Sequence, residues 1–213
     1  MVMRLLSQAR LYTFIDTTCL RGRDPADIAR QLCDGGSDLI QLRAKNLPAA
    51  GIRKMAEAIL PILQSAGVPL VINDHWELAC ELGADYCHLG QEDFFDTGLT
   101  AVSQRPSASR RPQVGLSTHA PDQALRAISA HPAYIAIGPV YSTPTKPSAR
   151  PVTLDYVHWA SENITLPWFA IGGITFATVD AVLAAGARRI CVVSEILNAP
   201  DIAKACADFK SRL

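Results

Sequence analysis

Short runs of apolar, β-branched and aromatic residues recur along the whole chain, and segments with helical spacing lie between most of them. Several of these runs are continuously apolar and do not alternate, which is typical of strands in a parallel sheet that is covered on both faces. The pattern predicts eight strands, near residues 11–15, 39–42, 70–72, 86–89, 114–116, 134–137, 168–171 and 190–193.

Three of the intervening segments give clear helix predictions. Residues 25–34 and 49–66 carry apolar side chains at helical spacing, so that each segment presents one apolar face. Residues 175–185 open with Thr175, a suitable N-cap, and end before Gly186, a suitable C-cap. We expect helices over all three segments.

Eight strands that alternate with helices indicate an α/β protein with a closed (β/α)8 TIM barrel. A doubly wound open sheet is the main alternative, because a strand count from one sequence can err by one or two. A chain of 213 residues with 49% hydrophobic content suits one barrel domain over residues 1–213. Residues 97–113, rich in arginine, proline and serine, break the rhythm, and there we expect a shortened helix and a mobile basic loop.

Composition limits the classes of partner. Lysine plus arginine and aspartate plus glutamate number 20 each, so bulk charge offers no attraction to nucleic acid or to an acidic membrane surface. Residues 1–9 lack the features of a signal peptide, and no apolar run reaches the roughly 18 residues of a spanning helix. We expect a cytoplasmic protein without a membrane partner, and a homo-oligomer is compatible with this sequence. The six cysteines form no C-x-x-C pair, which favours free thiols over disulfides or zinc.

Polar residues gather where the second, third and fourth predicted strands end. Alternation places Gln41, Arg43 and Lys45 on one face, and two converging cations suit a polyanion. Asp74 and Asp93 would project from neighbouring strands into the same barrel mouth, and magnesium commonly takes one or two carboxylates together with phosphate oxygens. The residues therefore indicate a site for a metal-bound diphosphate. The alternative is that acids such as Asp74 and Glu92 only cap the following helices.

The later strand ends add hydroxyls and glycines. Ser117 could donate to a phosphate oxygen or cap a helix, and His119 could be an acid or base or have a structural role. A polar cluster of two threonines and a lysine follows the sixth strand at Thr143, Thr145 and Lys146. Backbone N–H groups after the seventh and eighth strands, at residues 172–174 and 193–194, match the usual phosphate cradle of such barrels.

Together these motifs resemble the thiamine phosphate synthase family, which is related to the aminothiazole tautomerases. The resemblance runs from about Leu11 to the C-terminus, and each motif alone is modest, but the ordered set is specific. It is carried by Gln41-Leu42-Arg43-Ala44-Lys45, Asn73-Asp74, Gly90-Gln91-Glu92-Asp93, Gly115-Leu116-Ser117-Thr118-His119, residues 138–146 and Ala170-Ile171-Gly172-Gly173-Ile174.

The resemblance implies a magnesium-assisted transferase that joins a hydroxymethylpyrimidine diphosphate to a thiazole phosphate and releases diphosphate. It implies that Asp74 and Asp93 hold Mg²⁺. The pyrimidine diphosphate would be held by Gln41, Arg43, Lys45, Asn73, Ser117 and Lys146, with Arg43, Lys45, Lys146 and Ser117 as the catalytic set. The expected substrate-binding set also contains Leu42 and Ala44, and, for the thiazole phosphate, Thr143, Pro144, Thr145, Gly173, Val193 and Ser194.

Three other functions remain open at this point. A thiazole tautomerase would use His119 as its acid or base, but such enzymes tend to lose the metal acids that are present here. A lyase would form a Schiff base on Lys45 or Lys146, which requires a lysine in a dry pocket. A non-catalytic barrel that only binds thiamine phosphate would have no need of the two acids. A lid over the substrates is expected at residues 144–151.

Overall fold

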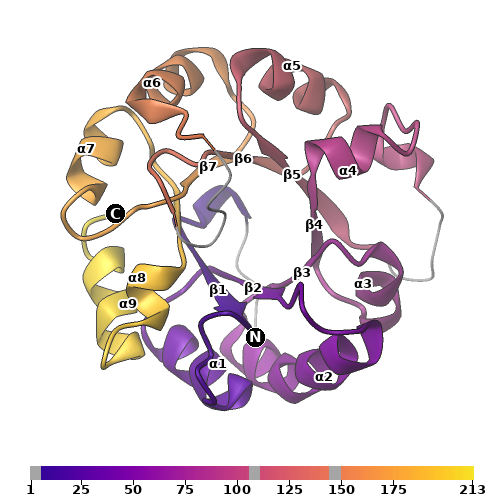
Figure 1. Ribbon diagram of the computed structural model, residues 1–213, viewed down its shortest axis with the longest axis vertical. Coiled ribbons are helices and arrows are strands. Elements are labelled where there is room, and N and C mark those ends of the chain that lie inside the picture. The colour runs from indigo at the N-terminus through magenta and orange to yellow at the C-terminus, as the bar shows by residue number, and fades with distance from the viewer. Residues whose placement is uncertain (1–5, 106–110, 144–149) are drawn as a thin grey trace.

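Eight parallel strands close into a barrel in chain order, with β1 hydrogen-bonded to both β2 and β8 (Figure 1). The computed structural model describes residues 6–105, 111–143 and 150–213. The closed barrel confirms the predicted fold, and each predicted strand lies within two residues of an observed one. The strands are β1 (Leu11–Asp16), β2 (Leu39–Arg43), β3 (Leu70–Asn73), β4 (Tyr86–Gly90), β5 (Gln113–Thr118), β6 (Tyr134–Ile137), β7 (Trp168–Ile171) and β8 (Ile190–Val192).

Helices form a ring outside the barrel (Figure 1). The two predicted over residues 25–34 and 49–66 are confirmed with the same bounds. The third begins four residues later than predicted, because the Thr175 N–H is hydrogen-bonded to the Thr178 hydroxyl in a turn that precedes the helix. The helices are α1 (Pro25–Asp34), α2 (Ala49–Ala66), α3 (Trp76–Leu82), α4 (Gln91–Phe95), α5 (Pro121–Ser129), α6 (Thr153–Asn163), α7 (Val179–Ala184), α8 (Ser194–Leu197) and α9 (Ile202–Lys210), with 3-10 turns η1 (Leu6–Gln8) and η2 (Val102–Gln104).

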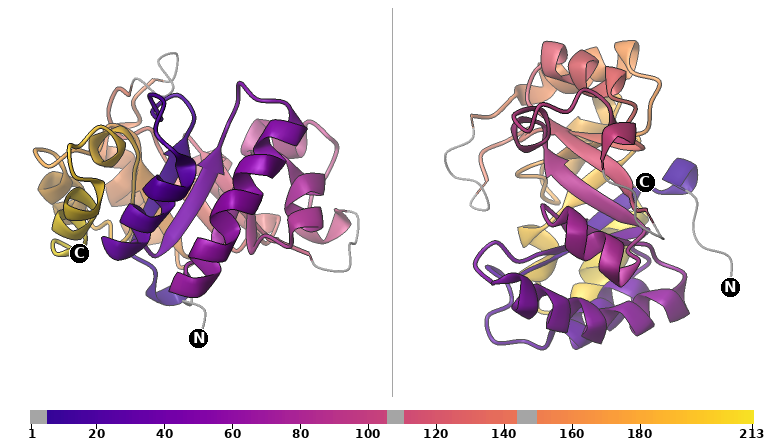
Figure 2. Two further views of the ribbon diagram at one scale, coloured as in Figure 1. Left: turned by 90° about the horizontal axis from the view of Figure 1, so that it is seen from below. Right: turned by 90° about the vertical axis from the view of Figure 1, so that its right-hand side faces the viewer.

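Alternation along each strand divides the apolar side chains into two clusters. One cluster fills the space between strands and helices, and β1 contributes Leu11 and Ile15 to it. The other fills the barrel interior and is rich in aromatic rings, among them Tyr12, Tyr134 and Phe169. Turn η1 contacts this inner cluster through Leu6 and lies across the end of the barrel where the strands begin (Figure 2). The interior is therefore closed at that end and open at the other.

The predicted irregular segment is confirmed as irregular. After the five-residue helix α4, the described residues before β5 form no helix or strand other than the turn η2. The basic loop expected within residues 97–113 includes residues 106–110, which lie outside the described residues, so its mobility stays a prediction. All six cysteines are free thiols, as predicted. Within the described part of the chain, none of the helices combines the length and the apolar character that crossing a membrane requires.

Candidate active site

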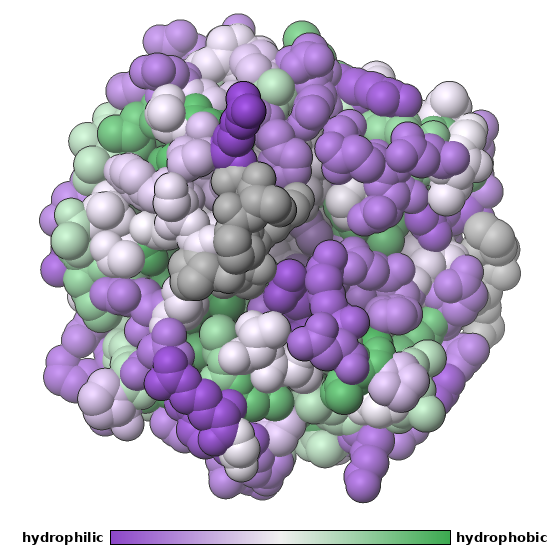
Figure 3. Space-filling view, in the orientation of Figure 1, coloured by the Kyte–Doolittle hydropathy of each residue, from purple (hydrophilic) through white to green (hydrophobic). Residues whose placement is uncertain are grey.

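A cavity of about 190 Å³ opens at the C-terminal ends of the strands. Gln41 and Arg43 of β2 line it, as does Lys45 just beyond, because alternate residues of the strand point into the barrel. Hydrophilic side chains gather beside the centre of this face of the molecule (Figure 3). Leu42 and Ala44, the residues between them, point the other way and pack in the cluster between strands and helices.

Arg43 is held by a carboxylate that is not among the predicted site residues. Asp16 ends β1 directly beside Arg43 and is fully buried. Its Oδ2 accepts from Arg43 Nη1 at 2.6 Å, and its Oδ1 accepts from the Thr18 N–H at 2.9 Å and the Thr18 hydroxyl at 2.7 Å. Asp16 directly follows the predicted strand at residues 11–15, so its position at a strand end is the signal in the sequence that marks it.

Asp74 faces the cavity instead of capping the next helix. Its backbone is left-handed, with φ of 65°, and α3 begins only after His75 without a side-chain cap. Its Oδ2 accepts from Asn73 Nδ2 at 2.6 Å and lies 3.4 Å from Lys45 Nζ. The Lys45 side chain is 53% exposed and paired with this acid, which argues against the dry lysine of a Schiff-base lyase.

Asp93 is the second acid of the mouth. It lies in the first turn of α4 and lines the same cavity as Asp74. Gly90, at the end of β4, leaves room for its carboxylate, because a Cβ atom there would lie 2.6 Å from Asp93 Oδ2. Two carboxylates form a hard-oxygen donor set that fits Mg²⁺, which fills its other positions with water and phosphate. Among the described residues, no group of three or more His, Cys, Asp or Glu could hold a metal, so the pair would rely on those additional ligands.

The opposite wall of the cavity is built from backbone. Gly172 and Gly173 have positive φ, and a Cβ atom on either would lie within 2.6 Å of the chain after β6, at Pro139 or Tyr141. The Val140 and Tyr141 N–H groups donate to the Ile171 and Gly172 carbonyls at 2.8 and 3.0 Å. The glycines are thus required by close packing of two loops, in addition to any approach to a ligand. Thr143, Gly173, Val193 and Ser194 line the cavity on this side.

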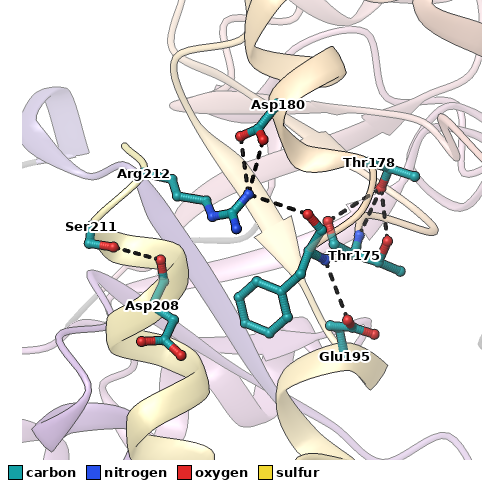
Figure 4. Close-up of polar contacts among 8 residues, drawn as sticks. Thr175, Thr178, Asp180, Glu195, Asp208, Ser211 and Arg212 are labelled. Carbon is teal, nitrogen blue, oxygen red and sulfur yellow. Dashed lines mark hydrogen bonds and ion pairs between the residues drawn. The ribbon is translucent and has the colours of Figure 1, made fainter.

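Side chains outside the cavity fix this backbone wall (Figure 4). Glu195, one residue after Ser194, accepts from the Phe176 N–H at 3.3 Å and so joins the loop after β7 to α8. Arg212, near the C-terminus, donates to the Phe176 carbonyl at 3.3 Å and to both Asp180 oxygens at 3.2 and 3.1 Å. The loop after β7 is therefore tied to α8 and to the C-terminal residues that follow α9.

A chain of hydrogen bonds runs through the barrel interior along the floor of the cavity, which Tyr12 and His88 also line. Gln41 Nε2 donates to the Tyr12 hydroxyl at 2.5 Å, which lies 2.9 Å from the Tyr134 hydroxyl. His88 Nδ1 is 3.1 Å from that hydroxyl, and His88 Nε2 is 2.8 Å from Ser117 Oγ. Burial lowers the pKa of His88 to about 4 and raises the pKa of both tyrosines. Tyr12, His88 and Tyr134 are not among the residues predicted for the site, since only the strand register brings them together.

His119 lies at the edge of the cavity, with Nδ1 against the Gly138 carbonyl oxygen. One of its ring nitrogens is thus engaged by the backbone, and the structure brings no carboxylate of a described residue into hydrogen bond with the other. Three expected site residues lie outside the described residues, as does most of the expected lid. They are Pro144, Thr145 and Lys146.

The sequence relationships agree with this geometry. The family model for thiamine monophosphate synthase matches residues 11–196. The chain is 46% identical over 183 residues to the thiamine-phosphate synthase of Thermus thermophilus, with 84% of each chain covered. The chain belongs to the thiamine monophosphate synthase family. The thiamine-phosphate synthase of Acidothermus cellulolyticus is another relative, 38% identical over 211 residues, which cover 98% of this chain and 96% of that protein.

Membership of the thiamine monophosphate synthase family makes the chain a transferase of thiamine biosynthesis that acts on thiamine precursors, with thiamine-phosphate synthase activity. Among solved structures, a thiamine phosphate pyrophosphorylase from Pyrococcus furiosus superimposes with a TM-score of 0.81 at 23% identity, covering 97% of this chain and 96% of that one. A 3-hexulose-6-phosphate synthase superimposes with a TM-score of 0.66 at 18% identity. At such identities these two likenesses concern the barrel fold alone.

Proposed function

We propose that the protein, in this cavity, joins 4-amino-2-methyl-5-hydroxymethylpyrimidine diphosphate to thiazole phosphate, giving thiamine phosphate and diphosphate. The observation that carries this proposal is the convergence of two cations and two acids on one cavity whose far wall is a backbone cradle. One side suits a metal-bound diphosphate and the other a phosphate monoester. A substrate pair with those two anionic ends would span the mouth.

Arg43 and Lys45 bind the diphosphate of the pyrimidine substrate. The buried Asp16 carboxylate fixes the Arg43 guanidinium, so the fork of donors is oriented before the substrate arrives. Lys45 adds a second positive charge next to Asp74. Gln41, Asn73 and Ser117 contact the remainder of this substrate, and Lys146 contributes a third cation. Leu42 and Ala44 can contribute backbone contacts only, because their side chains pack against the helix layer.

Asp74 and Asp93, which both line the cavity, would hold Mg²⁺. When bound, the ion neutralises negative charge on the diphosphate. The acids are oriented by their neighbours, Asp74 through Asn73 and Lys45, and Asp93 through the space that Gly90 leaves open.

The thiazole phosphate occupies the cradle formed by Gly173, Val193 and Ser194, which lines the cavity together with Thr143. Pro144 and Thr145, the other two residues proposed to bind it, lie outside the described residues. The ties from Glu195 and Arg212 support this assignment, because they hold the two loops at a fixed separation. A phosphate bound there is held by backbone N–H groups and hydroxyls and needs no cation of its own.

In the reaction, the bond between the pyrimidine methylene carbon and the diphosphate oxygen breaks, and the electron pair leaves with the diphosphate. The cation that remains is stabilised by resonance in the pyrimidine ring. Arg43, Lys45 and Lys146 stabilise the departing charge. The thiazole nitrogen, held in line by its phosphate, then donates its lone pair to the methylene carbon. No protein nucleophile is required.

A two-substrate assay tests the proposal. The purified chain is incubated with both substrates and magnesium, and thiamine phosphate is detected by fluorescence after oxidation. We expect product only when both substrates are present, and its loss when chelator is added. A folded, magnesium-supplied sample that forms no thiamine phosphate would overturn the proposed reaction.

A further inference from the structure

Because Gln41 Nε2 faces the Tyr12 hydroxyl, each donor in the hydrogen-bond chain from Gln41 to Ser117 points toward Ser117. The Tyr12 hydroxyl already accepts from Gln41 Nε2, so its own proton needs an acceptor. Rings surround it, with the centroids of Phe14 and Phe169 at 5.1 and 5.3 Å from that of Tyr12. Among the described residues, the Tyr134 oxygen is the one hydrogen-bond acceptor that this proton can reach.

The same reasoning fixes the next two links. Tyr134 accepts from Tyr12, so its proton must go to His88 Nδ1. A neutral imidazole that accepts at Nδ1 carries its proton on Nε2, and Nε2 is 2.8 Å from Ser117 Oγ. Ser117 therefore accepts from His88, and its own hydroxyl proton is left for an acceptor in the cavity, which Ser117 lines.

The backbone reserves space for this arrangement. Gly115 lies opposite Tyr134 in the pairing of β5 with β6. A Cβ atom at Gly115 would lie 2.1 Å from Tyr134 Cζ and 2.5 Å from its hydroxyl oxygen. The His88 ring stacks on that of Tyr134 at 5.6 Å with an interplanar angle of 23°. The Tyr134 hydroxyl is thus held between Tyr12 and His88 by packing as well as by hydrogen bonds.

We propose that His88 is a positioning residue, which as the Nε2–H tautomer makes the Ser117 hydroxyl a hydrogen-bond donor to an acceptor atom of the substrate. Gln41 sets the direction at the far end of the chain, so the two ends of one buried network meet the same substrate. The substrate part of this inference rests on the proposed function, in which Ser117 contacts the pyrimidine diphosphate. The tautomer part stands on the protein alone.

Nitrogen-15 NMR of the intact protein with labelled histidine tests the tautomer directly. The chain has five histidines, and the signals of His88 are those lost in His88→Gln. At pH 7.5 we expect His88 to be neutral with the proton on Nε2. Tyr134→Phe removes the donor to Nδ1, and we expect it to abolish this preference. A proton on Nδ1, or an unchanged tautomer in Tyr134→Phe, would overturn the proposal.

A double-mutant cycle tests whether His88 acts through Ser117. We expect His88→Gln and Ser117→Ala each to lower kcat/KM for the pyrimidine diphosphate about tenfold, the size of one hydrogen bond. If His88 only orients Ser117, the double variant should be no worse than Ser117→Ala. Independent losses that multiply to about a hundredfold would contradict the positioning role.

A matched control separates these results from a general effect of losing a histidine. His158 is exposed on α6, and His158→Gln should leave both the His88 signals and the kinetics unchanged. The NMR measurement needs no substrate. It therefore tests the tautomer even if the protein does not catalyse the proposed reaction. An active wild type with the wrong His88 tautomer would refute this inference alone.

Discussion

At the scale of single residues, the site depends on side chains that touch no substrate. Asp16 is fully buried, and one of its carboxylate oxygens accepts from Arg43 while the other accepts from Thr18. A buried carboxylate with every contact satisfied is a stable anchor, whereas removal of its charge leaves a guanidinium free to turn. Catalysis that relies on position is sensitive to such turning.

Asp16→Asn should therefore lower kcat/KM for the pyrimidine diphosphate roughly ten- to hundredfold, because Arg43 loses its charged partner while the shape is kept. Steady-state kinetics with saturating magnesium measure this. Asp27→Asn is the control, since Asp27 pairs with Arg30 on the exposed face of α1 and should change little. Equal activity of Asp16→Asn and wild type would show that Arg43 needs no anchor.

Gly90 offers a second test at this scale. Its φ of −61° suits any residue, so Gly90→Ala should fold, but the new methyl group would displace the Asp93 carboxylate. We expect the magnesium concentration for half-maximal activity to rise roughly tenfold. Gly51→Ala, where the nearest atom would be at an ordinary 3.5 Å, is the control. An unchanged magnesium requirement in Gly90→Ala would remove Asp93 from the metal site.

At the scale of elements, the apolar pattern predicted the strands well, because a doubly covered parallel strand must be apolar on both faces. Helix α7 was predicted to begin too early, at Thr175. The turn before it is closed by the Thr178 hydroxyl, which accepts from the Thr175 N–H, and the apolar pattern carries no signal of that bond. Alternation predicted that Gln41, Arg43 and Lys45 share a face, and all three line the cavity.

The alternation of side chains along a strand does not identify the residue that forms a hydrogen bond from another strand across the barrel. The hydrogen bond between Tyr12 and Tyr134 joins residues 122 positions apart, and it requires the stagger of all strands between them. A tyrosine inside an apolar run is therefore indistinguishable from an ordinary core ring in the sequence. The same holds for His88, whose two partners lie on β5 and β6.

The hydrogen bond from the Phe176 N–H to Glu195 links the loop after β7 to α8, and its loss should affect one substrate only. Glu195→Ala removes the acceptor for the Phe176 N–H and should let the loop after β7 move relative to α8. We expect KM for thiazole phosphate to rise roughly fivefold, with KM for the pyrimidine diphosphate nearly unchanged. Glu162→Ala on the exposed end of α6 is the control. A rise of both KM values together would show that the tie supports the whole barrel and not the cradle.

At the scale of the whole molecule, the buried His88 makes stability depend on pH. Its pKa is lowered by burial from 6.5 to about 4, against a smaller opposing effect of Asp74. As pH falls below 6.5, the unfolded chain takes up a proton at this position and the folded chain does not. The free energy of unfolding is therefore unaffected by this group above pH 6.5, and it falls as the pH decreases from 6.5 toward 4.

Between pH 6.5 and 4 we expect the free energy of unfolding to fall by on the order of 3 kcal/mol through this group alone. Urea unfolding with chelator present measures it, since bound metal would perturb the site. His88→Gln lacks the group, so its stability should fall less steeply over the same range. Parallel pH profiles for the two proteins would contradict the assignment of a neutral, buried His88.

The most direct test of the whole account is the magnesium dependence of thiamine phosphate formation in Asp74→Asn and Asp93→Asn, beside Asp96→Asn. Asp96 lies at the end of α4 and does not line the cavity, so its variant should behave as wild type. We predict that Asp74→Asn and Asp93→Asn each need a much higher magnesium concentration for activity, and that the double variant forms no product. Magnesium-dependent turnover that is unchanged without Asp74 and Asp93 would contradict the central claim that these acids hold the metal at the barrel mouth.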